Sequence, residues 1–233
     1  MREAIAQSGV ANTSSTGSQG GGVLSLTQQG PLFDIPNVYF SGTVSQSRGK
    51  AEFNGWTEQL DTVISSPELG TIRSTTADYT LRLGRSFDLE NLANAQITPF
   101  FQYSYHSWTD YLLTEGAVPN AYTDTAAAFG LLFQYALTSQ IVVKLDATVG
   151  QSIWQKVDHP GFPDFMLRSR ATGSLGWGVD YALSSTVHAN LDFNLSHFQY
   201  GKSGPYSVNS QTLFEPNSET TARDVMAGTG LHF

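Results

Sequence analysis

Apolar and polar residues alternate one by one along most of the chain from residue 38 onward. In the segment 141–154, one set of alternate positions holds Ile141, Val143, Leu145, Ala147, Val149 and Ile153. The positions between them are mostly small or charged: Lys144, Asp146, Thr148, Gly150 and Ser152. Because successive side chains of a β-strand point to opposite faces, this alternation predicts strands with one apolar and one polar face.

Eight segments carry the pattern, at 37–48, 75–87, 95–111, 121–137, 139–156, 165–183, 185–200 and 219–233. The connections between them alternate between long and short along the chain. This alternation is typical of outer-membrane barrels, which have short periplasmic turns and long outer loops. The sequence therefore predicts an all-β fold, an eight-stranded antiparallel up-and-down transmembrane β-barrel. With eight strands, both ends of the barrel domain are expected on the short-turn side.

The first part of the chain differs in composition from the rest. Residues 11–22 are rich in Ser and Gly, which is typical of a flexible segment that buries too little apolar surface to order itself. We expect residues 1–37 to form a flexible periplasmic segment or linker and residues 38–233 to form the barrel. Segments 22–27 and 51–56 could add strands, so a count of ten remains open.

Composition excludes several classes of protein. The 12 Lys and Arg against 20 Asp and Glu argue against a nucleic-acid partner, and the absence of Cys excludes disulfides and thiolate metal sites. The longest apolar run, 126–133, is far shorter than the roughly 20 residues of a spanning helix. No secretory signal peptide stands at the start of the sequence. We expect no cofactor and no bound metal.

The polar face indicates which side points inward. It holds Gly, Ser, Thr, Asn and Asp rather than the long charged side chains of a solvated surface. Aromatic residues near strand ends are interpreted as interfacial belts, at Phe87, Phe133, Tyr135, Trp177, Tyr181 and Phe233 on one side and Tyr103, Tyr105, Trp108, Tyr111, Trp154, Phe198 and Tyr200 on the other. The alternative is a soluble β-barrel that binds an apolar ligand, in which the apolar face points inward.

The last segment ends in an aromatic residue. Val225, Ala227, Leu231 and Phe233 are its apolar alternate positions. With Gly228, Leu231 and Phe233, it resembles the last strand of small bacterial outer-membrane barrels of the OmpA-like and opacity-protein type, although Met226 departs from the pattern. The resemblance implies an outer-membrane location and recognition of these three residues by the outer-membrane assembly machinery.

Ionisable residues on the polar face are candidates for a network in the bore. The candidates are Arg82, Lys144, Asp146, Arg168, Arg170, Asp180, Asp192 and Asp224, with Asp78, Asp124, His106 and His188 as further titratable groups. A charge left unpaired in a narrow interior is costly, so these groups must pair or meet water. Since side chains just fill an eight-stranded barrel, we expect no open pore.

Three pairs of residues could suggest catalysis: Ser104 with His106, Ser196 with His197, and Asp158 with His159. Some small outer-membrane barrels are lipid-modifying or proteolytic enzymes, which is the alternative function. A nucleophile needs a base within hydrogen-bonding reach, and the pairs are interpreted instead as hydrogen bonds at the rim. We therefore expect no enzymatic activity and no catalytic residue.

Residues 49–74 form the first outer loop and contain seven large apolar residues. This loop is interpreted either as an extension of the flanking strands or as a surface for a protein partner. Lipid and lipopolysaccharide of the outer membrane are the other expected partners. The predicted function is a structural or surface-interaction role carried by the outer loops.

Overall fold

The structure is a computed structural model that describes residues 14–32, 34–59, 62–113, 119–160, 164–208, 211–215 and 217–231. Nine long strands form its main sheet: β1 (Ser14–Leu32), β2 (Ile35–Gln59), β3 (Thr62–Arg85), β5 (Ala95–Leu112), β6 (Asn120–Ala136), β7 (Ile141–Asp158), β9 (Ala171–Ala182), β10 (Val187–Tyr200) and β13 (Ser218–Leu231). Two short strands, β4 (Phe87–Asp88) and β8 (Phe165–Leu167), pair with β5 and β7. A separate hairpin joins β11 (Tyr206–Val208) to β12 (Gln211–Leu213).

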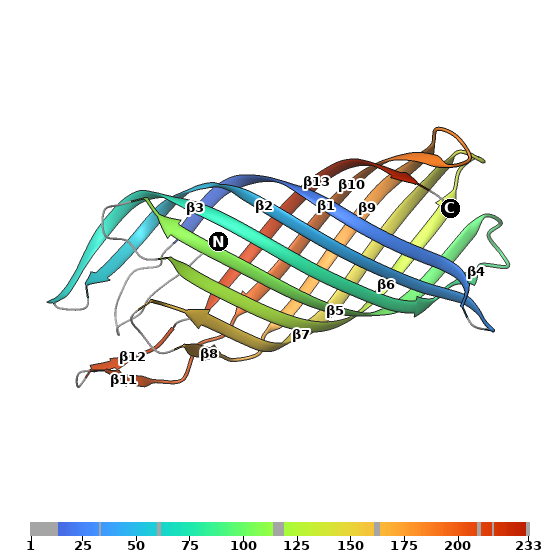
Figure 1. The fold of residues 1–233 in the computed structure, drawn as a ribbon. Helices are drawn as coiled ribbons and strands as arrows, with labels where there is room; N and C mark the ends of the chain where they lie inside the picture. The colour runs from blue at the N-terminus through green and yellow to red at the C-terminus, as the bar shows by residue number, and fades with distance from the viewer. Residues whose placement is uncertain are drawn as a thin grey trace.

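Every long strand is antiparallel to its neighbour, and the sheet curls around a central axis into a half-barrel (Figure 1). The strand order follows the chain from β1 to β13, so the two edges of the sheet are its first and last strands. No ladder joins β1 to β13 among the described residues. Because nine strands alternate in direction, these two edge strands run the same way.

The structure thus confirms an all-β antiparallel fold, but its long strands number nine rather than the predicted eight. The additional strand is β1, which occupies most of the region expected to be flexible. It pairs with β2 from Ser14 opposite Asn54 to Leu32 opposite Ile35. The expectation was wrong because composition describes a segment in isolation. A neighbouring strand supplies the backbone hydrogen bonds that a Gly- and Ser-rich segment needs to become ordered.

The connections do not separate by length between the two ends of the sheet as predicted, because the connection 86–94 has nine residues whereas the tip of the β2–β3 hairpin has two. We call one end of the sheet the "turn end"; its connections are 33–34, 86–94, 137–140 and 183–186. The opposite end is the "loop end"; it holds the connections 113–119, 159–170 and 201–217 and the tip of the β2–β3 hairpin. Residues 49–59 and 62–74 are an extension of β2 and β3, paired from Gly49–Ser74 to Gln59–Thr62. Because β1 is an additional strand, it begins at the loop end, whereas β13 finishes at the turn end. The expectation that both ends lie on one side is wrong for the described residues.

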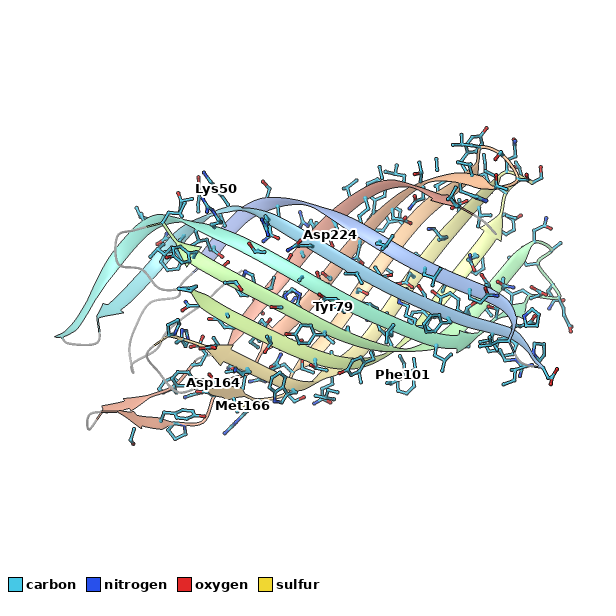
Figure 2. The ribbon with its side chains drawn as sticks, viewed as in Figure 1. Lys50, Tyr79, Phe101, Asp164, Met166 and Asp224 are labelled. Carbon is cyan, nitrogen blue, oxygen red and sulfur yellow. The ribbon has the colours of Figure 1, made fainter. Side chains whose placement is uncertain are left out.

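The apolar face of the sheet points outward. Large apolar side chains in the middle of the strands are between 39% and 71% exposed, among them Val44, Tyr79, Leu81, Phe101, Phe129, Leu145, Val149, Val179, Leu191, Leu195 and Val225. Figure 2 shows Phe101 projecting away from the curled sheet. The alternate polar residues face the interior. A soluble barrel with an apolar pocket would have the reverse arrangement.

One predicted strand is interrupted. The segment 165–183 divides into β8 and β9, and residues 168–170 lie outside both strands. The backbone N–H of Ser152 on β7 donates to the carbonyl of Arg170 in the bend at 2.9 Å. Gly201 lies against this bend, where a Cβ would be 2.0 Å from the carbonyl oxygen of Arg168. Alternation alone does not reveal such a bend, because β8 and β9 each keep the period.

Glycine at position 130 makes room for an aromatic ring inside the sheet. A Cβ at Gly130 would lie 2.3 Å from the ring of Phe100, which packs with Tyr39 and Leu132 near the turn end. We expect Gly130→Ala to lower the free energy of unfolding by about 1–3 kcal/mol, because the ring has to move within a packed interior. Urea unfolding measures the change. Gly22→Ala is the matched control, since its Cβ would meet open space; an equal loss in both variants would contradict the packing argument.

Candidate functional site

The interior of the curled sheet is the candidate functional site, and an ion pair crosses it near its middle. The guanidinium of Arg82 on β3 donates to both carboxylate oxygens of Asp146 on β7, at 2.8 and 3.2 Å. Its Nε donates to Gln102 Oε1 at 2.9 Å, and the guanidinium lies over the ring of Phe100. Since β5 and β6 separate β3 from β7 in the sheet, the pair ties together strands that are not neighbours.

A second ion pair lies on the other side of the interior. Lys144 Nζ on β7 is 2.9 Å from Asp192 on β10, with β9 between the two strands. Asn190 donates to the second oxygen of Asp192 at 2.8 Å. Asn194 donates to Asp224 on the edge strand β13 at 3.2 Å. Each of these carboxylates therefore has a donor, as the polar face of a narrow interior requires.

The structure places the remaining predicted network residues elsewhere. Asp180 pairs with His188 at 2.7 Å near the turn end. Arg168 is exposed in the bend at the loop end, and Arg170 donates to Asn217 in the connection after β10 at 2.9 Å. Arg168 and Arg170 were predicted as members of the bore network, but the break between β8 and β9 places both residues outside the strands.

Above the central ion pairs, toward the loop end, lies a group of polar side chains around His106. His106 Nδ1 is 2.5 Å from Asp78 Oδ1, and Ser45 donates to the other oxygen of Asp78. Asp124 accepts a hydrogen bond from Ser152 at 3.1 Å. Phe198 on β10 covers His106, with ring centroids 4.9 Å apart. Since β5 and β10 lie far apart in the strand order, this contact spans the interior.

Aromatic side chains fill the interior at the loop end. Trp108, Tyr122 and Tyr200 are at most 3% exposed and form one cluster with Val157, Phe165 and Leu167. Trp108 stacks on Tyr122 with their ring centroids 4.9 Å apart, and the ring centroids of Tyr122 and Tyr200 are 5.2 Å apart. Trp108, Phe198 and Tyr200 were expected in the outward aromatic belt, which is wrong. They occupy the inward register of β5 and β10, where they form an apolar plug.

The connection after β10 folds over this plug. Glu215 is buried there; it accepts a hydrogen bond from the Tyr122 hydroxyl at 3.0 Å and lies 3.1 Å from His159 Nε2. The backbone of Glu215 is held by Ser203, whose hydroxyl accepts its N–H at 2.8 Å. Glu215 was not among the predicted site residues, because nothing in a Gly- and Ser-rich loop indicates that one carboxylate turns inward.

Asp110 is the clearest titratable group at this end. It lies near the end of β5, where the neighbouring outward positions Thr75 and Thr109 are polar. Burial raises the pKa of its carboxyl to about 6, although Ser74 and the Trp108 indole, 2.7 Å away, oppose the shift by hydrogen bonding. The ionised carboxylate is therefore costly to keep in the folded protein.

Stability should consequently fall with rising pH around this residue. The pKa of Asp110 is higher in the folded than in the unfolded protein. Its contribution to the free energy of unfolding is therefore complete below about pH 4 and is lost as pH rises through about 6. We expect Asp110→Asn to remove this part of the pH dependence and to raise the free energy of unfolding at pH 7 by up to about 3 kcal/mol. Urea unfolding between pH 4 and 8 measures both effects. Parallel pH curves for the two proteins would contradict the assignment.

The histidines of the three Ser–His and Asp–His pairs, which were interpreted as groups in rim hydrogen bonds rather than as catalytic dyads, take partners outside their pairs. His106 bonds Asp78, and His197 points to the other face of the sheet, 3.2 Å from Thr221. His159 bonds Asn120 and Glu215 rather than its neighbour Asp158. No group of three potential metal ligands occurs among the described residues.

The last strand lies at the edge of the sheet. Gly228 pairs with Asn190 and Leu231 with Val187, and the side chain of Leu231 is 66% exposed. Phe233, the third residue of the proposed assembly signal, lies outside the described residues. None of the described residues forms a helix with the length and apolar character needed to cross a membrane.

Comparisons with known proteins give little further information. No protein-family model matches the sequence, and no curated protein matches it either. The solved structures that match include the ferric preacinetobactin receptor BauA from Acinetobacter baumannii, with 13% identity and a TM-score of 0.26. The match covers 94% of this chain and 42% of the receptor. A likeness at this level supports no argument about function.

Proposed function

We propose that the chain is an integral outer-membrane β-barrel protein with a structural or surface-interaction role, rather than an enzyme. The observation that carries the proposal is the outward position of the apolar side chains combined with the inward position of the paired polar ones. Water does not favour such an arrangement, because it exposes a continuous apolar surface. In a bilayer, lipid covers the same surface.

The apolar surface has the height that a membrane needs. On β3 the outward positions are apolar from Ala77 to Leu83, and on β5 from Ile97 to Tyr105. Each stretch, with its flanking residues, is about 9–11 residues long, the length with which a tilted strand crosses the hydrocarbon layer. In this proposal the turn end faces the periplasm, the loop end faces outward, and the last strand carries the signal for the assembly machinery.

The absence of cysteine allows a direct test of location and orientation. Single cysteines are introduced at Gly204, exposed at the loop end, and at Ser139, exposed at the turn end. The full chain is exported in a Gram-negative host and treated with a membrane-impermeant maleimide. We expect labelling of Gly204→Cys on intact cells and of Ser139→Cys only after lysis. Recovery of the protein in the salt-washed soluble fraction would refute the proposal.

The proposed role does not include solute diffusion. The apolar plug fills the interior at the loop end, and the two central ion pairs cross the interior closer to the middle of the sheet. We therefore expect the reconstituted protein to show no stable conductance steps in a planar bilayer, whereas a general diffusion porin in the same bilayer does. Persistent steps of porin size would contradict a filled bore.

The extended β2–β3 hairpin is the part of the protein best placed to meet a protein partner. It continues the curled sheet beyond the band of outward apolar residues (Figure 1). Leu69 on this hairpin is 82% exposed. Because the hairpin extends the sheet beyond the proposed hydrocarbon layer, the surface-interaction role is assigned to this element.

A further inference from the structure

Three basic side chains lie together on the outward face of β2 and β3. Arg48 and Lys50 occupy alternate positions of β2, and Arg73 is the direct partner of Lys50 on β3. All three are exposed, and Figure 2 shows Lys50 projecting away from the curled sheet. We call Arg48, Lys50 and Arg73 the basic patch. It holds three of the 12 basic residues of the chain.

The basic patch carries charge that the protein itself does not neutralise. Among the described residues, none of its three cations lies within ion-pair distance of a carboxylate. Glu52 is the nearest acidic residue on the same face of β2, and it follows Lys50 by two positions. Like charges directly opposite each other on paired strands are destabilising, so Lys50 opposite Arg73 needs an external anion or a well-solvated site.

The position of the basic patch selects the kind of anion. Arg48 follows Val44, the outward apolar residue of β2 that precedes the basic patch, by four positions, which is about 13 Å along a strand. Long basic side chains can also reach back toward an apolar surface. The basic patch therefore lies just beyond the proposed hydrocarbon layer, at the level of lipid headgroups on the loop side.

The surroundings of the basic patch are small or hydroxylated. On β1, Ser18 lies opposite Lys50 and Gly20 opposite Arg48. A Cβ at Gly20 would meet no atom within 4 Å, so this side of the patch is open. On the other side, Tyr111 pairs with Arg73 and is 45% exposed. A headgroup thus has space over β1 and an amphipathic ring beside it.

We propose that the basic patch binds the phosphate groups of a phosphorylated lipid in the outer leaflet, with lipid A as the matching chemistry. This site rests on the proposed outer-membrane function and names one partner of it. Neighbouring strands are about 4.8 Å apart and alternate residues about 7 Å apart, so the three cations can surround one phosphate and reach a second.

The test compares lipids that differ only in phosphate. The full chain is inserted into phosphatidylcholine vesicles containing lipid A with both phosphates or the same lipid with its phosphates removed, in the presence of EDTA. Co-migration with floated vesicles reports insertion. Native mass spectrometry after transfer to detergent reports lipid that remains bound. The variant replaces Arg48, Lys50 and Arg73 by Gln, and the matched control is Arg85→Gln, an exposed outward cation at the turn end.

We expect the wild type and Arg85→Gln to retain phosphorylated lipid A, and the triple variant to bind it about tenfold or more weakly. Equal retention by all three proteins, equal retention of the dephosphorylated lipid, or competition by free inorganic phosphate at concentrations equal to the lipid would each overturn the site. Binding that appears only with added magnesium would instead assign it to the acidic groups of the rim, such as Glu52. Failure to float with vesicles would overturn the membrane function itself, and so separates the two proposals.

Discussion

Replacing Val149 by arginine is expected to destabilise the folded protein in a bilayer by about 2–4 kcal/mol, the cost of a basic residue at the lipid-facing midplane. Val149 is 71% exposed on β7 and lies opposite Phe129 on β6, which is 70% exposed. In water, such an exposed position would tolerate arginine with little change. The substitution therefore distinguishes a lipid-facing surface from a solvated one by the sign and size of a single effect.

Unfolding in urea from phosphatidylcholine vesicles measures this cost. Leu69→Arg is the control, because Leu69 is 82% exposed but lies on the β2–β3 hairpin beyond the apolar band. We expect no measurable change there. If Val149→Arg and Leu69→Arg unfold at the same urea concentration as the wild type, the middle of the sheet does not contact lipid.

The second large effect is expected inside the sheet, at the Arg82–Asp146 pair. Asp146→Asn leaves a guanidinium without its counter-charge in an interior where the two side chains are only 23% and 18% exposed. Removing one partner of a buried pair costs about 3–5 kcal/mol, and the partial exposure places the expected loss near 3 kcal/mol. Unfolding in vesicles measures the loss.

A double variant tests whether the loss comes from the unpaired charge. Arg82→Met combined with Asp146→Leu removes both charges, and we expect it to recover most of the stability lost in Asp146→Asn. Asp164→Asn is the surface control, since its pair with Lys156 lies on the exposed loop side. A loss in Asp146→Asn no larger than that in Asp164→Asn would show that the central pair is fully solvated.

The faces of the strands can be predicted from the sequence, because the burial of side chains and the alternation of apolar and polar residues both have a period of two along a strand. Leu191 and Phe129 are exposed, while Lys144 and Asp146 form inward ion pairs, as the pattern indicated. Seven of the eight predicted segments correspond to single long strands, and the eighth is divided by the bend before β9. Antiparallel strands that pair with their neighbours along the chain require little information beyond their sequence order.

The incorrect predictions concern residues whose placement depends on contacts with other parts of the fold. The segment that forms β1 was expected to be flexible, with only 22–27 left open as a possible strand, because its order depends on pairing with β2. Trp108 and Tyr200 were assigned to the membrane interface because aromatic residues near strand ends suit both an interfacial belt and an interior plug. The inward contact of Glu215 with Tyr122 depends on the path of a long connection, and no periodic pattern constrains such a path.

The shared direction of β1 and β13 has a consequence for assembly. All the neighbouring long strands of the main sheet can pair in chain order, because each joins the next long strand along the chain. To close the sheet into a barrel, β1 and β13 would have to pair with each other, although they lie about two hundred positions apart in the sequence. Because they run in the same direction, this pair would be parallel. Parallel ladders have slanted hydrogen bonds and are slightly weaker per residue. We therefore expect the β1–β13 contact to form last during assembly and to separate first. Its separation would leave a lateral opening between these two strands, where another strand can pair.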